Sequence, residues 1–214
     1  AIDNTYLGPI WQKPMDWGAD MSCYSATKFL SGHSDLIAGA IIGNKESLLA
    51  IKSLRTFLGN MASPNTCWLL TRSLETLSIR MNRQAENAIS VVNFLQKHNH
   101  VSRVYFPGLD SQGEKQVSIQ KRQSISSGAM ISFDVKGGEE SAFRILNKLS
   151  LIKLAVSLGS NESLAQHPFH MTHADMPDEE KESLKLTDSM IRLSIGIEAP
   201  EDLIQDLKQA MEGL

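Results

Sequence analysis

The stretch Ser25-Ala26-Thr27-Lys28, with Gly32-His33-Ser34-Asp35 just after it, lies between two segments that are typical of β-strands. Residues 18–24 (GADMSCY) alternate apolar and polar side chains, a pattern that favours a strand. Residues 36–42 (LIAGAII) are apolar throughout, as expected of a strand that is covered on both faces. The loop therefore places one lysine and two hydroxyls between two strands of a predicted sheet.

These side chains suit a ligand that carries both a phosphate and an aldehyde. The hydroxyls of Ser25 and Thr27 can hydrogen-bond the oxygens of a phosphate monoester. A desolvated lysine at position 28 has a lowered pKa, and its amine can attack an aldehyde. Pyridoxal 5'-phosphate (PLP) carries both a phosphate and an aldehyde. Its pyridine nitrogen needs an acid to stay protonated. Asp3, which follows a short apolar run that suits the end of a strand, could be that acid. Taken alone, however, a lysine in a polar loop is most often a solvated surface residue.

Other interpretations of the motifs fit less well. Gly32-His33-Ser34-Asp35-Leu36 has the serine of a hydrolase nucleophile elbow, but its fifth residue is Leu instead of Gly. A P-loop is excluded because the chain has no Gly-Lys-Ser/Thr triplet. His167, His170 and His173 are spaced by threes, yet Pro168 breaks any helix that would align them, and no Cys or acid completes a zinc pattern. We therefore expect no metal site, and we expect these histidines to serve packing and loop hydrogen bonds.

An arginine on a predicted strand needs an anionic partner. In residues 190–196 (MIRLSIG), Ile191 and Leu193 fall on one face of the strand and Arg192 and Ser194 on the other. The planar guanidinium of Arg192 suits bidentate pairing with a carboxylate. Without further context, that carboxylate is more often a protein acid in a structural ion pair than a ligand.

Several stretches, taken together and in this order, resemble the signatures of the Cys/Met metabolism family of PLP-dependent enzymes. They are residues 2–5 (IDNT), 25–28 (SATK), 32–35 (GHSD), 156–164 (VSLGSNESL) and 191–198 (IRLSIGIE). The resemblance implies an α/β fold, the PLP-dependent transferase fold (fold type I). It implies that Lys28 holds the cofactor as a Schiff base and carries protons, that Asp3 pairs with the pyridinium, and that Ser25 and Thr27 bind the phosphate.

The same resemblance implies how the substrate binds. Arg192 would bind the α-carboxylate of an amino acid, helped by Ser157. The family usually has two glycines after the Ser-Leu pair, whereas the second is Ser160 in this chain. We expect this difference to reshape the loop without altering the chemistry.

The residue before Ser157 bears on the choice of substrate. Within the family, cystathionine γ-synthases and γ-lyases commonly have Glu there and methionine γ-lyases have Val, and this chain has Val156. A carboxylate suits the distal ammonium of cystathionine, and valine suits a methylthio group. We therefore predict a PLP-dependent carbon–sulfur lyase, methionine γ-lyase, that forms methanethiol, ammonia and 2-oxobutanoate. Cystathionine γ-lyase and cystathionine γ-synthase are the alternatives.

A third possibility is a catalytically incomplete fragment or a non-enzymatic interaction module. The chain begins with Ala1, and the resemblance covers about the later half of a family member, so we expect a fragment whose absent half carries further cofactor contacts. Loss of chemistry is disfavoured because a decayed site should lose its costly buried charges first, whereas Asp3, Lys28 and Arg192 are all present.

The rest of the chain predicts two parts of an α/β protein. Apolar residues at three-to-four spacing run through residues 45–58 and 66–77 and continue to Leu95, which predicts a long helix that links two domains. Beyond it strands and helices alternate. The predicted strands are 101–106, 129–135, 152–156 and 190–195, and the predicted helices are 112–122, 139–149 and 200–211. We predict that residues 1–79 form the C-terminal part of the PLP-binding domain and residues 80–214 a small C-terminal α/β domain.

Composition restricts the partners. The net charge of −3 and pI of about 6.1 give no basic field that would select nucleic acid. The longest apolar runs, such as residues 36–42, are shorter than the ~20 residues that cross a bilayer, so we expect no membrane span. Two cysteines, Cys23 and Cys67, fit a reducing cytosol and are expected to be buried free thiols. The family resemblance implies a homo-oligomer, a tetramer built as a dimer of dimers.

Overall fold

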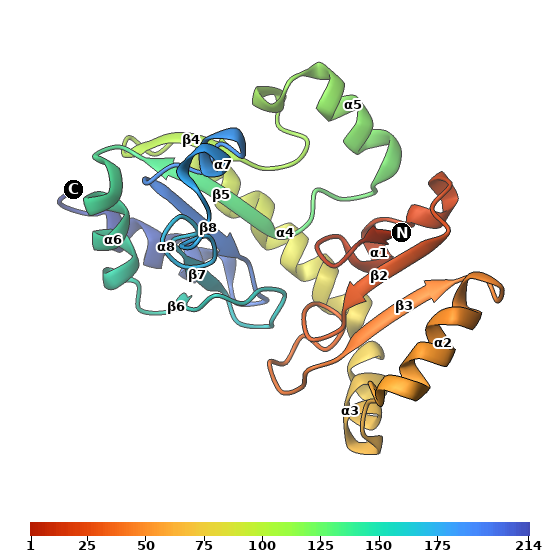
Figure 1. Cartoon of the computed structure of the whole chain (residues 1–214). Helices are drawn as coiled ribbons and strands as arrows, with labels where there is room; N and C mark the ends of the chain where they lie inside the picture. The colour runs from red at the N-terminus through yellow and green to blue at the C-terminus, as the bar shows by residue number, and fades with distance from the viewer.

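The computed structural model describes residues 1–214 and contains two β-sheets (Figure 1). The smaller sheet has the order β1-β2-β3, with β1 (Ile2–Asp3) parallel to β2 (Met21–Ser25) and β3 (Gly39–Gly43) antiparallel to β2. The short helix α1 (Gly8–Trp11) and the 3₁₀ turn η1 (Pro14–Trp17) connect β1 to β2. The loop that contains Lys28 connects β2 to β3, as the sequence predicted.

The larger sheet has five strands in the order β4-β5-β8-β7-β6. They are β4 (Val101–Tyr105), β5 (Met130–Val135), β8 (Met190–Ser194), β7 (Leu164–Gln166) and β6 (Lys153–Leu154). The pairs β4–β5, β5–β8 and β7–β8 are antiparallel, and β6–β7 is parallel. The strand predicted at residues 190–195 is thus central in the sheet, and this position holds Arg192 on a strand with a neighbour on each side.

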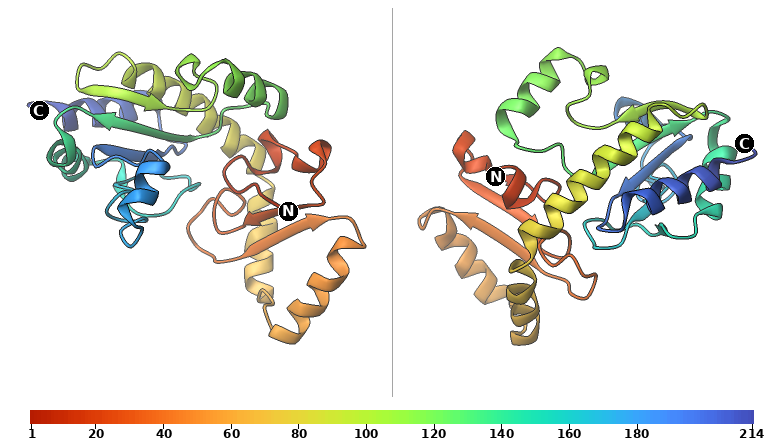
Figure 2. Two further views of the ribbon diagram at one scale, coloured as in Figure 1. Left: turned by 45° about the horizontal axis from the view of Figure 1, so that its top comes forward. Right: turned by 180° about the vertical axis from the view of Figure 1, so that it is seen from behind.

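Helices pack against the larger sheet and against one another. α6 (Gly138–Lys148) and α8 (Pro200–Met211) contact each other, and α6 contacts β5 and β8. The 19-residue helix α4 (Leu77–Leu95) contacts α8, β4 and β5. Figure 2 shows α4 running from the smaller sheet to the larger one, so the predicted linking helix is present. The division of the chain at residues 79 and 80 stays a prediction, and it falls close to the start of this helix.

One hydrophobic core joins the two parts of the chain. The largest fully buried side chains include Phe133, Ile191 and Leu203 in the five-stranded region. The same buried cluster includes Trp11 and Phe29 from the first part of the chain, whose rings meet edge to face with centroids 5.7 Å apart. Because Phe29 follows Lys28 directly, the lysine turn is anchored in this core.

The expected double coverage of residues 36–42 is wrong for this chain. The strand β3 begins later, at Gly39, and it is an edge of the smaller sheet. Ile37 is 89% exposed and Ile42 is 50% exposed. A continuous apolar run favours a strand, but whether its faces are buried depends on neighbours that the run itself does not specify.

Helices α2 (Ser47–Leu58) and α3 (Pro64–Leu74) follow β3, and α4 starts after a break at residues 75 and 76. The sequence therefore predicted the helical stretches but extended the second one three residues too far. The predicted helices at 112–122, 139–149 and 200–211 correspond to α5 (Glu114–Gln123), α6 and α8. The strand β7 and the helix α7 (Asp178–Ser183) were not predicted. None of the helices is long and apolar enough to cross a membrane.

Candidate functional site

Lys28 lies on a turn that its own backbone holds tightly. The Lys28 N–H donates to the Ser25 carbonyl over 3.1 Å, and the Lys28 carbonyl accepts from the Gly32 N–H over 2.7 Å. Ala26 and Phe29 on either side of it are fully buried, which directs the side chain of Lys28 out of the core. Hydrogen bonds and buried neighbours together make this turn a stiff support for one half-buried amine.

The amine of Lys28 lies at a meeting point of the two parts of the chain. Its Nζ donates to Ser157 Oγ over 2.9 Å, and Nη2 of Arg192 donates to the Ser157 carbonyl over 3.3 Å. The structure thus brings together three residues that are 129 and 35 positions apart in the chain. The amine points toward Ser157, which links it to the arginine.

Neither cation has an acidic partner. The chain has two salt bridges, His170 to Glu139 and Lys181 to Asp178, and neither involves Lys28 or Arg192. A structural ion pair, the more common role of a strand arginine, is therefore excluded for Arg192 within this chain. Two neighbouring cations without a counter-ion form a site that favours an anion.

Electrostatics lowers the pKa of both groups. Burial lowers the pKa of Lys28, and the positive charge of Arg192 lowers it further. Burial also lowers the pKa of Arg192, while the nearby phenol of Tyr6 opposes this shift. A lowered pKa increases the fraction of Lys28 that is a neutral amine, the form that acts as nucleophile or base.

The loop that carries Ser157 packs directly on the lysine turn. The Asn161 N–H donates to the Gly32 carbonyl over 2.8 Å, and Ser34 Oγ donates to Ser160 Oγ over 2.9 Å. A Cβ on Gly159, which has φ +78°, would lie 2.6 Å from the backbone nitrogen of Phe29. Only glycine fits this approach, so the spacing between Ser157 and Lys28 depends on it.

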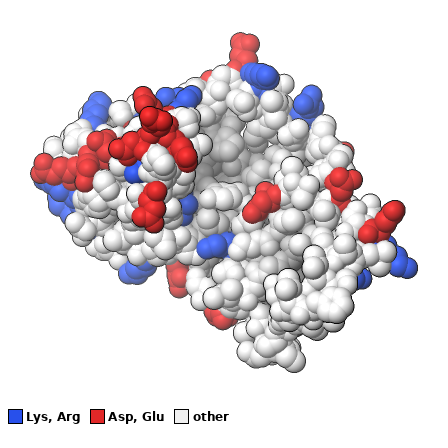
Figure 3. Space-filling view, in the orientation of Figure 1, with Lys and Arg blue, Asp and Glu red and all other residues white.

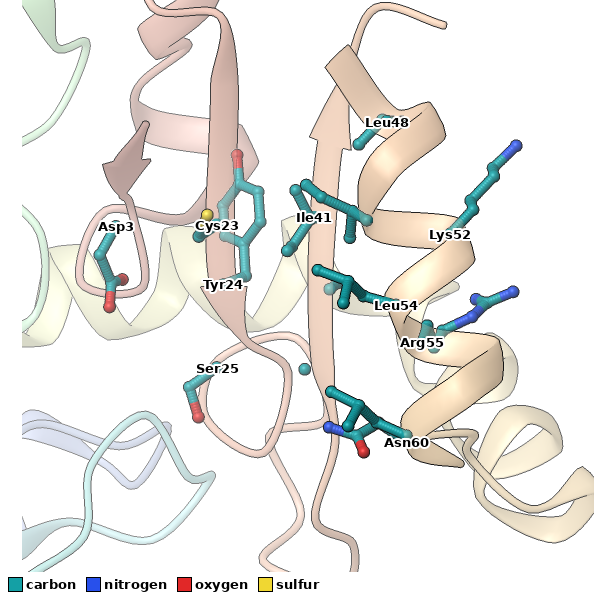
Figure 4. Close-up of a pocket in the computed structure, with 14 residues that line it drawn as sticks. Asp3, Cys23, Tyr24, Ser25, Ile41, Leu48, Lys52, Leu54, Arg55 and Asn60 are labelled. Atoms are coloured by element: carbon teal, nitrogen blue, oxygen red, sulfur yellow. The ribbon is translucent and has the colours of Figure 1, made fainter. Parts of the chain in front are cut away.

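Asp3 and Ser25 form a second group on the smaller sheet. Asp3 pairs in register with Cys23, so Asp3, Cys23 and Ser25 share one face of the strands. Both Asp3 and Ser25 line a pocket between this sheet and α2, together with apolar side chains of β3 and α2 (Figure 4). Lys52 and Arg55 project from α2 away from them in the same view. Lys28, three residues after Ser25, does not line this pocket.

The hydroxyl of Thr27 is already engaged. Thr27 Oγ1 accepts from the Ala38 N–H over 3.0 Å and donates to the Ala38 carbonyl over 3.3 Å, which closes the base of the loop between β2 and β3. This use is structural. A phosphate would compete with the Ala38 carbonyl for the single hydroxyl proton.

Comparison with known proteins adds to this geometry. The Cys/Met metabolism PLP-dependent enzyme family matches residues 1–212. The chain belongs to this family. It is 44% identical over 213 residues to L-methionine gamma-lyase of Fusobacterium nucleatum subsp. polymorphum, covering 99% of the chain and 53% of the relative. It is 43% identical over 213 residues to cystathionine gamma-lyase of Dictyostelium discoideum, covering 99% of the chain and 54% of the relative.

Solved structures of the Cys/Met metabolism family confirm the predicted fold. A cystathionine gamma-lyase from Micromonospora echinospora superposes with a TM-score of 0.93 at 38% identity, covering 99% of this chain and 55% of that one. A cystathionine gamma-synthase from Xanthomonas oryzae pv. oryzae superposes with a TM-score of 0.92 at 40% identity, covering 98% and 54%. The α/β fold is therefore that of fold type I PLP-dependent enzymes. The chain spans about half the length of the relatives it matches.

The three histidines have packing and loop contacts, as expected. His167 is fully buried, stacks on Phe143 with ring centroids 4.7 Å apart, and bonds the Asp188 carbonyl through Nε2 over 2.8 Å. Burial lowers its pKa. His170 pairs with Glu139 over 3.2 Å, and Nδ1 of His173 lies 3.2 Å from the Pro168 carbonyl. These contacts fold the segment between β7 and α7.

The structure also corrects and extends the sequence analysis. Cys67 is exposed instead of buried, because it lies on α3, where Ser73 is the one buried residue, while Cys23 is partly buried. Tyr6, whose phenol opposes the fall in the pKa of Arg192, was missed, although its position directly after the motif at residues 2–5 is a signal that could have found it. Acidic side chains gather over α7, whose first turn holds Asp178, Glu179 and Glu180 (Figure 3).

Proposed function

We propose that the protein catalyses a PLP-dependent elimination at the γ-carbon of a sulfur amino acid, with L-methionine as the substrate. The observation that carries the proposal is the pair Lys28 and Arg192, two neighbouring cations without an acidic partner, joined through Ser157. An amino acid brings the missing carboxylate. Arg192 binds this carboxylate with its planar fork and Ser157 orients it, which holds the α-carbon near the Lys28 amine.

The residues around the turn fit PLP. Lys28 would hold the aldehyde carbon, because its lowered pKa makes the amine nucleophilic. Asp3 would pair with the pyridine nitrogen, and the Ser25 hydroxyl would bind the phosphate. Thr27 would contribute to the phosphate site by turning its hydroxyl proton from the Ala38 carbonyl to a phosphate oxygen. When bound, PLP supplies an electron sink that makes the α-proton of an amino acid acidic.

Lys28 then acts as the proton carrier. An amine whose pKa is lowered by burial and by Arg192 has a larger neutral fraction near neutral pH than an exposed lysine. It can take the α-proton and return a proton to another carbon of the same substrate. Ser157 Oγ, which lies 2.9 Å from Nζ, keeps the amine in place between the two events.

Val156 supports methionine as the substrate. It precedes Ser157 directly, and its side chain is 54% exposed and apolar. An apolar side chain at the edge of the substrate site favours a methylthio group and gives no counter-ion for the second ammonium of cystathionine. Cystathionine γ-lyase is the second candidate, because a cystathionine gamma-lyase is 43% identical to this chain, nearly as similar as the methionine gamma-lyase.

The test is a substrate comparison on the full-length gene product. We expect kcat/KM for L-methionine to exceed that for L-cystathionine. Val156→Glu should shift the ratio toward cystathionine by about tenfold, since a hydrogen bond to a charged group contributes roughly 1.5–3 kcal/mol. Val156→Gln, whose side chain is as large as that of Val156→Glu but uncharged, is the matched control and should shift the ratio much less. A wild-type preference for cystathionine would overturn methionine γ-lyase in favour of the second candidate.

PLP binding separates an enzyme from a non-enzymatic module. We expect PLP to give a visible absorbance band with the wild-type protein, and borohydride to attach the cofactor permanently to the peptide that contains Lys28. Lys28→Ala should abolish both. Covalent attachment to another lysine would contradict the assigned role.

The family also suggests how the protein is organised. We expect a homo-oligomer, a tetramer built as a dimer of dimers, located in the cytoplasm. Light scattering on the full-length gene product measures the oligomer size directly. A monomer that is fully active would contradict this expectation.

A further inference from the structure

Three polar residues are buried on one face of α4. Arg80 is 5% exposed, and Gln84 and Asn87 are 0% exposed. Their spacing of four and three residues places them in a row along one side of the helix. The neighbouring buried positions are apolar, such as Met81 and Ala88, so polar side chains here are costly unless each finds a hydrogen-bond partner.

Arg80 binds the lysine turn. Its Nη1 donates to the Phe29 carbonyl over 2.9 Å, and its Nη2 donates to the Leu30 carbonyl over 3.3 Å. Arg80 also donates to the Ser73 carbonyl over 3.0 Å and to Thr76 Oγ1 over 3.1 Å, and it has no salt bridge, so all its partners are uncharged oxygens. A Cβ on Gly32, which has φ +67°, would lie 1.9 Å from Nη1. The guanidinium therefore fills the inside of the turn that carries Lys28.

The next two residues of the row bind the substrate side of the site. Gln84 Nε2 donates to the Ser160 carbonyl over 2.8 Å. Asn87 Nδ2 donates to the Gly196 carbonyl over 3.0 Å and to the Glu198 carbonyl over 2.7 Å. Ser160 lies on the loop of Ser157, and Gly196 follows the strand of Arg192.

We propose that Arg80, Gln84 and Asn87 are positioning residues, through which α4 holds the segments of Lys28, Ser157 and Arg192 at fixed separations. The inference rests on the proposed function, since it assigns these residues a role in that reaction. All three bind main-chain carbonyls on the segments that carry the reacting groups, and none binds another side chain of the site. The seven residue steps from Arg80 to Asn87 span roughly 10 Å of a rigid helix.

The hydrogen bonds of Arg80 and Gln84 fix the separation between Lys28 and Ser157. The distance of 2.9 Å between Lys28 Nζ and Ser157 Oγ joins segments from the two parts of the chain. Arg80 ties the first segment to α4 and Gln84 ties the second, one helical turn further on. Moving either segment by a fraction of an ångström misplaces the amine relative to the bound carboxylate, which weakens catalysis even when the fold is intact.

Gln84→Met tests the row with a side chain of similar length that has no donor. In the PLP-loaded, full-length gene product we expect KM for L-methionine to rise about tenfold, the loss that follows when roughly one positioning hydrogen bond is removed. We expect kcat to change less, because Arg80 still holds the lysine turn. Asn82→Ala, on the exposed side of α4, is the matched control and should leave KM unchanged.

Arg80→Lys tests the other end of the row. Lysine keeps the charge but lacks the fork that reaches the carbonyls of Phe29, Leu30 and Ser73. We expect the pH at which the visible absorbance of bound PLP changes to move, and kcat to fall more than KM rises. A purely structural role would lower the melting temperature and leave the pH of this change where it is in the wild type.

Hydrogen exchange gives a readout without PLP. In the cofactor-free protein, Gln84→Met should speed exchange at the Asn161 amide, which bonds Gly32, more than at the amides of β5. If Gln84→Met does not fold, Gln84→Asn, which keeps the donor on a shorter side chain, should show the same changes more weakly. An unchanged KM with unchanged exchange at Asn161 would overturn the positioning role. A wild type that binds PLP but does not turn over sulfur amino acids would overturn the proposed function alone.

Discussion

The five-stranded region and the region of α2 and α3 have similar apolar patterns but opposite surroundings. In the five-stranded region the apolar faces of α4, α6 and α8 are buried in the core. In α2 no residue is buried, and in α3 only Ser73 is. Figure 3 shows a mainly uncharged surface where β3, α2 and α3 lie. A helical apolar period therefore predicts the helix, whereas burial depends on what the helix contacts.

The proposed site lies where the two sheets meet. Lys28 follows β2 of the smaller sheet, Arg192 lies on β8 of the larger one, and Ser157 lies on the loop between β6 and β7. The turn that carries the Lys28 amine is therefore held in place by side chains buried in the core, such as Phe29 and Arg80.

The largest difference in the free energy of unfolding is expected between alanine substitutions of two phenylalanines. Phe133 on β5 is 0% exposed and Phe57 on α2 is 85% exposed. Phe133→Ala should lower the free energy of unfolding by about 4 kcal/mol, through lost burial and the cavity left behind. Phe57→Ala should change it by less than about 0.5 kcal/mol. Urea unfolding of the 214-residue chain measures both. Equal losses in the two variants would mean that the α2 face is covered in solution, and the comparison would fail.

The polar contacts of the well-packed region give a second test. Asp206 on α8 is buried and accepts from the N–H groups of residues 150–152, at 2.9, 3.0 and 2.9 Å. Asp206→Ala leaves three donors without an acceptor and should lower the free energy of unfolding by about 3 kcal/mol. Asp202→Ala, on the exposed first turn of the same helix, should cost about 0.5 kcal/mol. A loss of less than about 1 kcal/mol for Asp206→Ala would show that water reaches these N–H groups.

Local pattern predicted much of this structure, and long-range contact decided the rest. The strand of Arg192 was predicted because apolar and polar side chains alternate there, and the site residues were predicted from motifs that the family shares. Burial of residues 36–42 was not predictable, because one strand does not show what lies beside it. Gln84 and Asn87 were missed for a related reason. Their partners are main-chain carbonyls 76 and 109 positions away, and such partners leave no motif in the sequence.

The contact between the loop of Lys28 and the loop of Ser157 gives a third, smaller effect on the free energy of unfolding. Ser34 has φ +57° and its hydroxyl bonds Ser160, where the family usually has glycine. Ser34→Ala loses the bond and should lower the free energy of unfolding by about 1 kcal/mol. Ser34→Gly loses the same bond but relieves about 1 kcal/mol of backbone strain, so its net effect should be near zero. A double-mutant cycle with Ser160→Ala checks the pairing. Fully additive losses for Ser34→Ala and Ser160→Ala would show that the two hydroxyls do not interact.

The smallest effect is expected in the titration of Lys28, because the site is partly exposed and water screens its charges. Burial and then the charge of Arg192 lower the pKa of Lys28 below its ordinary value of 10.5. Arg192→Met removes only the second cause, so the pKa should rise and still stay below 10.5. The pH dependence of acetylation of Lys28 by acetic anhydride, followed by mass spectrometry on the cofactor-free protein, measures this shift. Arg144→Met, which removes the same charge at an exposed position, should leave the pKa of Lys28 unchanged.

The lowered pKa of Lys28 also makes the free energy of unfolding depend on pH. Because the folded chain holds Lys28 with a lowered pKa, the unfolded chain binds more protons between the folded value and 10.5, and Lys28 makes stability rise with pH across this window. Below the folded pKa the charged amine carries the full penalty of its burial and of its repulsion by Arg192. Arg192→Met raises the lower edge of the window and should flatten this rise. If the rise keeps its slope and range in Arg192→Met, the two cations do not interact, and the argument that an anion belongs between them loses its electrostatic basis.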